Sequence, residues 1–225
     1  MSFDPSKCDP DLGLRVQEHL VKLGLHTPIN NEKISVPAKD KIEIIERHTR
    51  EVWKALGLDL NDDSLSDTPR RIAKMLVLET TWGLDPYSFP KCTAIENKMG
   101  YDEMLIERGV KVMSLCEHHG VVIDGKATVA YIPKGKVIGL SKINRVVDYF
   151  SRRPQVQERL TAQIMEALKL ILETDDVAVS ITARHYCVIS RGIEDTGSET
   201  VSTALSGQFK TNPGTRHEFM AALKG

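Results

Sequence analysis

Apolar residues recur at helical spacing in the first hundred residues and predict two helices, which end at Gly24 and Gly57. The two apolar stripes are Leu12, Leu14, Val16, Leu20 and Leu23, and Ile42, Ile45, Val52, Trp53 and Leu56. The polar, proline-bounded residues 27–37 predict a linker between them. Thr68-Pro69 predicts a third helix, with Thr68 as its N-cap, that runs to about Gly83. We therefore expect an N-terminal helical region over residues 1–100.

Beyond residue 100 the pattern changes to strands and longer helices. Residues 104–115, 121–132, 177–189 and 200–209 have the composition and alternation of strands. Between the two pairs, Ser141 is expected to cap a helix that runs to about Arg153, and Pro154 to open a longer one. The apolar face of that longer helix would be Val156, Leu160, Ile164, Leu168 and Ile171. A last short helix follows Thr215.

The order β-β-α-α-β-β over residues 101–225 predicts an α+β fold, an antiparallel sheet with helices on one face. The chain would form one catalytic unit overall, with the helical region attached to it. Such a sheet keeps two open edges, and proteins manage open edges by pairing or covering them. We therefore expect the protein to form a homo-oligomer.

Composition narrows the class of protein. The chain has 225 residues, of which 41% are hydrophobic and 27% charged, enough to bury a sizeable core. A net charge of −1 gives no basic field for nucleic acid, and no apolar run is long enough for a membrane span. Four cysteines and the lack of a secretion signal predict a reduced, cytoplasmic protein. Cys8 and Cys92 have no histidine nearby and are expected to be free thiols.

Two short motifs carry candidate metal chemistry. They are Cys116-Glu117-His118-His119 and His185-Tyr186-Cys187. Thiolate and imidazole are the ligands that zinc prefers, so we expect Cys116, His119 and Cys187 as ligands, with His118 and His185 left for proton transfer. In a strand, His185 and Cys187 would project to the same side. Spacing alone leaves open a catalytic zinc, a closed structural zinc and a disulfide between Cys116 and Cys187.

Basic residues stand at the starts of two predicted helices, where cations are unfavourable by about 0.3–1 kcal/mol each. These residues are Arg71 and Lys74 in the third helix, and Lys142 and Arg145 in the helix after Gly139. A polyanion bound there would offset this cost, and Arg191 lies just beyond the second motif. A solvated basic face is the alternative. Gln157 and Glu158 offer the donors and acceptors that bind a planar base edge.

Five motifs together resemble the GTP cyclohydrolase I family, most closely its bacterial branch, from about Leu56 to Phe219. They are Cys-Glu-His-His, Gly-Leu-Ser-Lys-Ile-Asn-Arg, Arg-Pro-Gln-Val-Gln-Glu-Arg-Leu, His-Tyr-Cys and Thr-Arg-His-Glu-Phe. The resemblance implies a tunnelling fold and a homodecamer of two stacked pentamers with active sites at subunit boundaries. The implied reaction converts GTP and water to 7,8-dihydroneopterin triphosphate and formate, the first step of tetrahydrofolate and pterin biosynthesis.

The resemblance also implies a role for each site residue. Cys116, His119 and Cys187 would bind Zn²⁺, which activates water for attack on guanine C8. His185 would protonate the imidazole-ring nitrogen of guanine, and His118 and Ser141 would serve the later proton transfers at the ribose. Glu158, with Gln157, would anchor the guanine edge. The triphosphate would bind to Arg71, Lys74, Lys142, Arg145 and Arg191, some of them from a neighbouring subunit.

Two other functions are alternatives to this hydrolase. A nucleoside deaminase requires His-x-Glu followed by Pro-Cys-x-x-Cys, and the sequence contains neither. A non-catalytic, zinc-stabilised oligomer that binds nucleotides would keep the metal ligands without turnover. The presence of the proton-transfer histidines beside the ligands favours the enzyme.

Overall fold

The centre of the structure, a computed structural model that describes residues 4–224, is a five-stranded sheet with the strand order β5-β2-β3-β6-β7. Its strands are β2 (Leu105–Cys116), β3 (Val122–Tyr131), β5 (Pro154–Gln155), β6 (Val177–His185) and β7 (Thr200–Leu205). All neighbours pair antiparallel except β5, which runs parallel to the end of β2. A second small sheet pairs β1 (Ala94–Glu96) with β4 (Lys136–Ile138).

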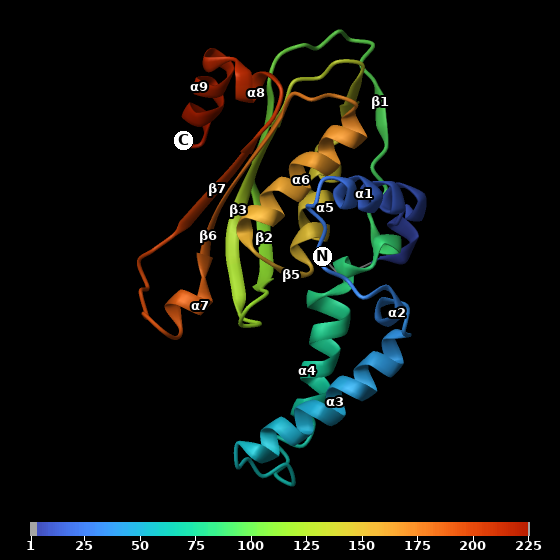
Figure 1. The fold of residues 1–225 in the computed structure, drawn as a ribbon, viewed down its shortest axis with the longest axis vertical. Helices are drawn as coiled ribbons and strands as arrows, with labels where there is room; N and C mark the ends of the chain where they lie inside the picture. The colour runs from blue at the N-terminus through green and yellow to red at the C-terminus, as the bar shows by residue number, and fades with distance from the viewer. Residues whose placement is uncertain (1–3, 225) are drawn as a thin grey trace.

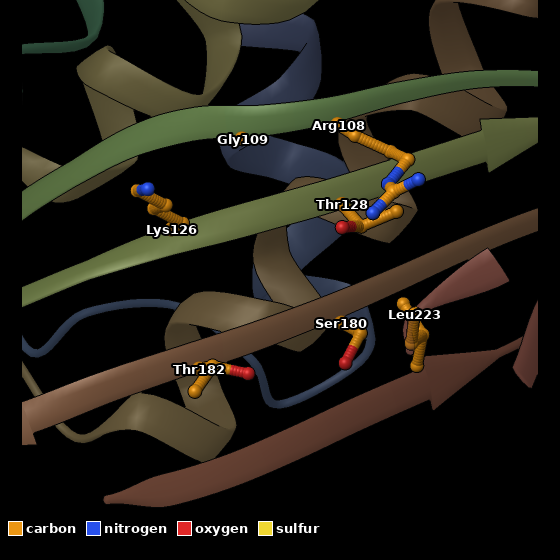
Figure 2. A pocket seen from close by; sticks show the side chains of 7 residues that line it. All are labelled: Arg108, Gly109, Lys126, Thr128, Ser180, Thr182 and Leu223. Carbon is orange, nitrogen blue, oxygen red and sulfur yellow. The ribbon is translucent and has the colours of Figure 1, made fainter. Parts of the chain in front are cut away.

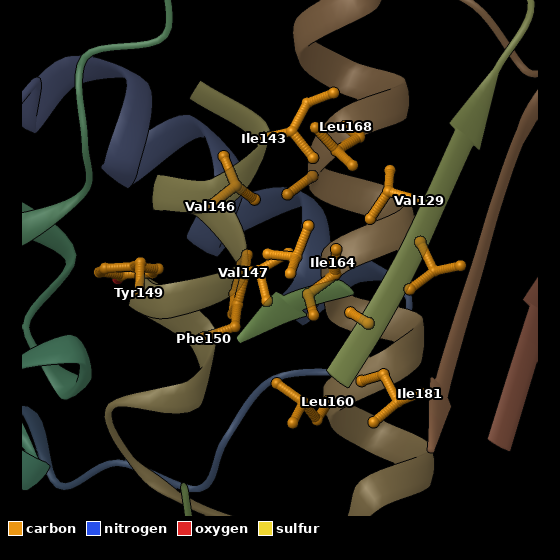
Figure 3. Close-up of a cluster of buried hydrophobic side chains, with 14 of the residues drawn as sticks. Val129, Ile143, Val146, Val147, Tyr149, Phe150, Leu160, Ile164, Leu168 and Ile181 are labelled. Atoms are coloured by element: carbon orange, nitrogen blue, oxygen red, sulfur yellow. The ribbon is translucent and has the colours of Figure 1, made fainter. Parts of the chain in front are cut away.

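Two long helices, α5 (Leu140–Ser151) and α6 (Gln157–Leu172), cover one face of this sheet (Figure 1). Their apolar side chains interdigitate with those of β3 and β6 (Figure 3), and Leu160, Ile164 and Val129 are completely buried. On the predicted apolar face of the long helix, Leu160, Ile164, Leu168 and Ile171 are all buried. The α+β class with helices on one face is thereby confirmed.

The N-terminal part of the chain is helical, as expected. Its elements are η1 (Pro5–Lys7), α1 (Pro10–Lys22), α2 (Asn31–Ile34), α3 (Ala38–Ala55), α4 (Thr68–Lys74), η2 (Met75–Thr80), η3 (Trp82–Leu84) and η4 (Pro86–Ser88). Val16 and Leu20 of α1 join the core beneath α6, whereas α3 and α4 pack on each other and extend away from the sheet (Figure 1). The second predicted stripe is only partly buried, because Val52 and Leu56 are 59% and 71% exposed.

Arg153 joins the N-terminal segments to the helices of the sheet. Although it stands at a helix end, it is buried to 1% exposure. Its guanidinium donates to the carbonyl of Gly83 and to Thr27 Oγ1, and lies 4.7 Å from the ring centroid of Tyr149. Burial lowers the pKa of Arg153, and the Tyr149 hydroxyl opposes that shift. Three segments far apart in sequence therefore meet at one side chain.

Several predicted helix boundaries are wrong. Residues Asp67 and Gly139 precede α4 and α5, so Thr68 and Ser141 lie inside their helices and are not N-caps. Pro154 pairs with Leu115 in β5, and α6 begins only at Gln157. Pro154 and Gln155 form a strand because the end of β2 lies beside them and pairs with them. This neighbour is distant in sequence, so the apolar pattern around Pro154 does not predict it.

The third expected strand, over residues 177–189, is also shorter than its pattern. The last pair of the β3–β6 ladder is Ile123 with His185, and a helical turn, α7 (Tyr186–Ile189), follows. The chain ends with α8 (Gln208–Thr211) and α9 (Pro213–Ala222). Over residues 4–224, no helix combines the length and apolar character that crossing a bilayer requires.

Candidate metal centre and active site

Cys116, His119 and Cys187 meet at one end of the sheet, as the sequence predicts. Their ligand atoms all lie within 4.8 Å of one another, and Cys116 Sγ is 3.6 Å from His119 Nδ1. All four cysteines are free thiols in the structure. The disulfide alternative for Cys116 and Cys187 is therefore not realised.

The turn that carries Cys116 and His119 is fixed by backbone hydrogen bonds and by an ion pair with α6. Cys116 ends β2 and donates its N–H to Val121 O at 2.7 Å, while Gly120 adopts φ +66° and donates to Cys116 O at 2.9 Å. Glu117 accepts two hydrogen bonds from Arg159 of α6, at 2.6 and 3.2 Å. These bonds lower the pKa of Glu117. Arg159 was not assigned a role from the sequence, although it follows Glu158 directly.

Cys187 reaches the cluster from α7 and not from a strand. The sequence argument that His185 and Cys187 project together from one strand is wrong, because β6 ends at His185. The turn is closed by the Ser190 hydroxyl, which donates to Tyr186 O at 2.6 Å. Burial and the neighbouring thiol of Cys116 raise the pKa of Cys187, whereas the positive charge of Arg191 lowers it. Arg191 thus lies close enough to act on the cluster.

The geometry of the three side chains fits a zinc ion. Zn–S and Zn–N bonds of about 2.3 and 2.05 Å at a tetrahedral angle place sulfur and nitrogen about 3.6 Å apart. The Cys116–His119 separation has this value. Among the described residues no fourth histidine, cysteine or carboxylate joins the group. Three protein ligands with one position left over are typical of a catalytic zinc and not of a closed structural one.

His185 is anchored beside this cluster by Gln157. The imidazole Nε2 is 2.7 Å from Gln157 Oε1. The Gln157 amide nitrogen donates to Ile181 O at 2.9 Å and Thr200 O at 3.0 Å, and the residue is only 2% exposed. Burial lowers the pKa of His185, and the charge of Glu158 opposes that shift. The side-chain amide of Gln157 is thus already fully engaged within the protein.

Two further predicted residues of this end are accessible to a ligand. His118 is 64% exposed in its side chain, with Nε2 3.8 Å from the Glu117 carboxylate. Glu158 is exposed at the first turn of α6, close enough to influence His185. The structure therefore brings His118, His185, Glu158 and Arg191 into the neighbourhood of the Cys116–His119–Cys187 cluster.

Ser141, Lys142 and Arg145 lie elsewhere in the same chain. They belong to the first half of α5, where Asn144 Nδ2 is 3.4 Å from Glu107 Oε1. Glu107 precedes Cys116 by nine residues, which is up to roughly 30 Å along an extended strand. The charges of Lys142 and Arg145 act instead on Cys92, whose pKa burial raises to about 12. Within one chain these three residues and the metal cluster are at different ends of the sheet.

Arg71 and Lys74 are exposed on α4, the helix that packs against α3 outside the sheet (Figure 1). Arg71 Nη2 is 4.0 Å from the Asp67 carboxylate, its own helix neighbour. No hydrogen bond or ion pair within residues 4–224 connects either cation to the metal cluster. The candidate site residues of one chain therefore form one cluster at the end of the sheet and two separate basic groups.

Comparisons with known proteins agree with one another. The family model for GTP cyclohydrolase I matches residues 45–224. The "GTP cyclohydrolase 1" of Tolumonas auensis is 57% identical over 206 residues, covering 92% of this chain and 94% of its own. The proteins of the same name from Aliivibrio fischeri and Vibrio vulnificus are 56% and 57% identical over 209 residues, covering 93% of this chain and 95% of their own.

Among solved structures, an archaeosine synthase QueF-Like in the apo form aligns with 48% of this chain and 94% of its own. The alignment has 24% identity and a TM-score of 0.38. This likeness is too weak to add to the assignment.

Proposed function

The chain belongs to the GTP cyclohydrolase I family, and on this premise we propose that it converts GTP and water to 7,8-dihydroneopterin triphosphate and formate with a zinc ion. The observation that carries the proposal is the Cys116–His119–Cys187 cluster with His185 beside it, held by a buried glutamine. The product would enter tetrahydrofolate and pterin biosynthesis. The cytoplasmic location inferred from the cysteine content stays a prediction.

Cys116, His119 and Cys187 would hold the ion, which when bound is a Lewis acid that activates water near neutral pH. His185 would protonate the imidazole-ring nitrogen of guanine. Because the Gln157 amide nitrogen donates to two carbonyls, its oxygen must accept from His185 Nε2. His185 would then give and retake the catalytic proton through Nδ1.

The other residues would bind and orient the substrate. The Glu158 carboxylate would anchor the guanine edge. Gln157 was expected to share this role, but its side-chain amide is engaged with His185, Ile181 and Thr200, so it would act through His185. His118, exposed at the turn after β2, and Ser141 would serve the proton transfers at the ribose. A triphosphate would be held by the remaining cations, which are Arg71, Lys74, Lys142, Arg145 and Arg191. Guanidinium and ammonium groups bind phosphate oxygens through charge-assisted hydrogen bonds.

This site would be complete only in an oligomer. Ser141, Lys142 and Arg145 belong to the opposite end of the sheet from the cluster, so a neighbouring copy would have to supply them. The short β5 and the β7 strand leave sheet edges open to such a neighbour. Val52 of α3 and Leu56, the C-cap of that helix, are exposed apolar side chains. These features support a homo-oligomer with active sites at subunit interfaces. The number of copies, a homodecamer of two stacked pentamers, comes from the family resemblance alone.

Formate release tests the proposal directly. The purified protein given GTP should release formate and yield a pterin that fluoresces after oxidation, and a chelator should stop both until zinc is restored. The reason is that the three cluster residues alone provide no activated water. A non-catalytic nucleotide-binding oligomer would instead bind GTP with its metal present and release no formate. That result would overturn the enzymatic proposal.

A further inference from the structure

The face of the sheet that α5 and α6 leave uncovered carries a cavity of about 430 Å³. Figure 2 shows its wall, with Arg108 extending across β3 toward Thr128. The lining side chains are mostly cationic or hydroxylic: Arg108, Lys126, Thr128, Ser180 and Thr182, with Gly109 and Leu223 completing the wall. Donors of hydrogen bonds thus dominate this wall, and it contains no carboxylate.

Strand register brings the charges of this wall together. Lys126 of β3 lies directly opposite Lys111 of β2 and, on its other side, opposite Thr182 of β6. Like charges directly opposite in an antiparallel pair are destabilising. Within the described residues, Arg108, Lys111 and Lys126 form no ion pair. The acid on this stretch of β3 is Asp124, which faces Arg184 across the ladder. An uncompensated cationic pair of this kind is what a bound anion would stabilise.

The cavity is separate from the candidate active site. Alternation along β6 puts Ser180 and Thr182 on the uncovered face, whereas His185 contacts Gln157 of α6 on the other face. The cations assigned to the substrate triphosphate lie on α4, on α5 and after α7, and none of them lines the cavity.

We propose that this face is a second anion site, which binds phosphate groups through Arg108, Lys126 and the hydroxyls of Thr128, Ser180 and Thr182. Guanidinium and ammonium groups are the side chains that bind phosphate oxygens most strongly, and the hydroxyls add neutral donors. Thr128 and Thr182 have no hydrogen-bond partner for their hydroxyls within residues 4–224. The site takes either inorganic phosphate or the chain of phosphates of a larger molecule.

Calorimetric titration of the full-length protein tests this site, with orthophosphate and inorganic tripolyphosphate as probes. The Arg145→Ala background weakens the proposed substrate site, and the change in heat that a second substitution on the sheet face causes in this background reports the sheet face. There, Lys126→Gln should weaken phosphate binding about tenfold, the usual effect of losing one charge-assisted hydrogen bond. Lys22→Gln, which removes an exposed lysine of α1, should bind as the parent does. Saturation by orthophosphate would identify free phosphate as the ligand, and saturation by tripolyphosphate alone a phosphate chain.

Thermal unfolding gives a second test, in which Lys126→Gln should stabilise the protein although it weakens phosphate binding. Without ligand, Lys126→Gln should raise Tm, because it removes the repulsion from Lys111. The rise in Tm that tripolyphosphate causes in the parent should shrink in the variant, because the site has lost a cation. Unchanged phosphate affinity in Lys126→Gln, or a loss of all binding in Arg145→Ala alone, would overturn the proposal. Neither result depends on catalysis, so the site can fail while the proposed function holds.

Discussion

At the scale of single residues, the contact between His185 and Gln157 shows how a buried partner can orient a candidate catalytic group. The two residues lie 28 positions apart. The sequence predicted His185 as a proton-transfer residue and Gln157 as a residue that binds a base edge. The fold places Gln157 Oε1 2.7 Å from His185 Nε2. Because both amide protons of Gln157 already go to backbone carbonyls, the imidazole has one orientation and one tautomer. Single-residue chemistry was predictable from the sequence, whereas this pairing was not.

Replacing His185 by alanine separates proton transfer from metal binding. His185→Ala should keep about one zinc per chain, because its ring is bonded to Gln157 and does not belong to the Cys116–His119–Cys187 cluster. Activity should fall by about 10²- to 10⁴-fold, the usual contribution of a general acid–base residue. Metal analysis and formate release measure the two effects, with the exposed His26→Ala as control. Loss of zinc together with activity would make His185 a ligand.

Gln157→Ala tests whether the glutamine acts through His185. Loss of the hydrogen bond frees the imidazole to rotate and change tautomer, so kcat should fall by about 10- to 100-fold, a part of the general acid–base effect. Zinc content should stay at the parent level. The exposed Gln208→Ala is the matched control. If KM rises instead and kcat is unchanged, Gln157 serves the guanine edge and not His185.

At the scale of elements, the sequence predicted types better than boundaries. Apolar periodicity predicted α6, and its residues Leu160 and Ile164 are fully buried. Pro154, by contrast, was expected to open that helix and instead pairs with Leu115. The strand expected to reach Ile189 ends at His185 because its partner β3 begins at Val122. Periodicity records which face is apolar, but the end of a strand depends on a neighbour distant in sequence.

The packing of α6 against the sheet should dominate the stability of the fold. Leu168 is 1% exposed within the main hydrophobic core. Leu168→Ala should lower the free energy of unfolding by about 2–5 kcal/mol, the combined loss of burial and cost of a cavity. Denaturant unfolding measures this change. Val21→Ala on α1, at a side chain 50% exposed, should stay within about 0.5 kcal/mol of the parent. A small effect at Leu168 would mean that the helix repacks.

At the scale of the whole molecule, the candidate site is divided. The metal cluster lies where β2 ends, whereas Arg145 belongs to the first half of α5, near Glu107. The sequence motifs predict that the cluster residues and Arg145 serve one site, but the fold of one chain does not bring them together. Val52 and Leu56 show the same limit: their apolar stripe predicts burial, yet they are 59% and 71% exposed. The proposed homo-oligomer would account for both features, because a neighbouring copy could complete the site and cover these side chains.

Mixing two inactive variants tests whether copies share a site. Cys187→Ala removes a cluster ligand and Arg145→Ala removes a cation of α5, so each alone should be inactive or nearly so. In a mixed oligomer, some interfaces join the intact cluster of one copy to the intact Arg145 of another. Random pairing of equal amounts in a closed ring restores about a quarter of the interfaces. We therefore expect formate release to recover to about that fraction after co-refolding.

The control for this experiment mixes two variants with the same defect. Cys116→Ala and Cys187→Ala both remove the cluster, so no interface between them regains it and the mixture should stay inactive. Arg145→Ala by itself should weaken the binding of GTP more than that of guanosine, because guanosine has no triphosphate for Arg145 to bind. Recovery in the first mixture and not in the control requires Arg145 to act on the cluster of another copy. Equal inactivity in both mixtures would place the whole site within one chain. The separation along β2 between Cys116 and Glu107, which Asn144 of α5 contacts, argues against that outcome.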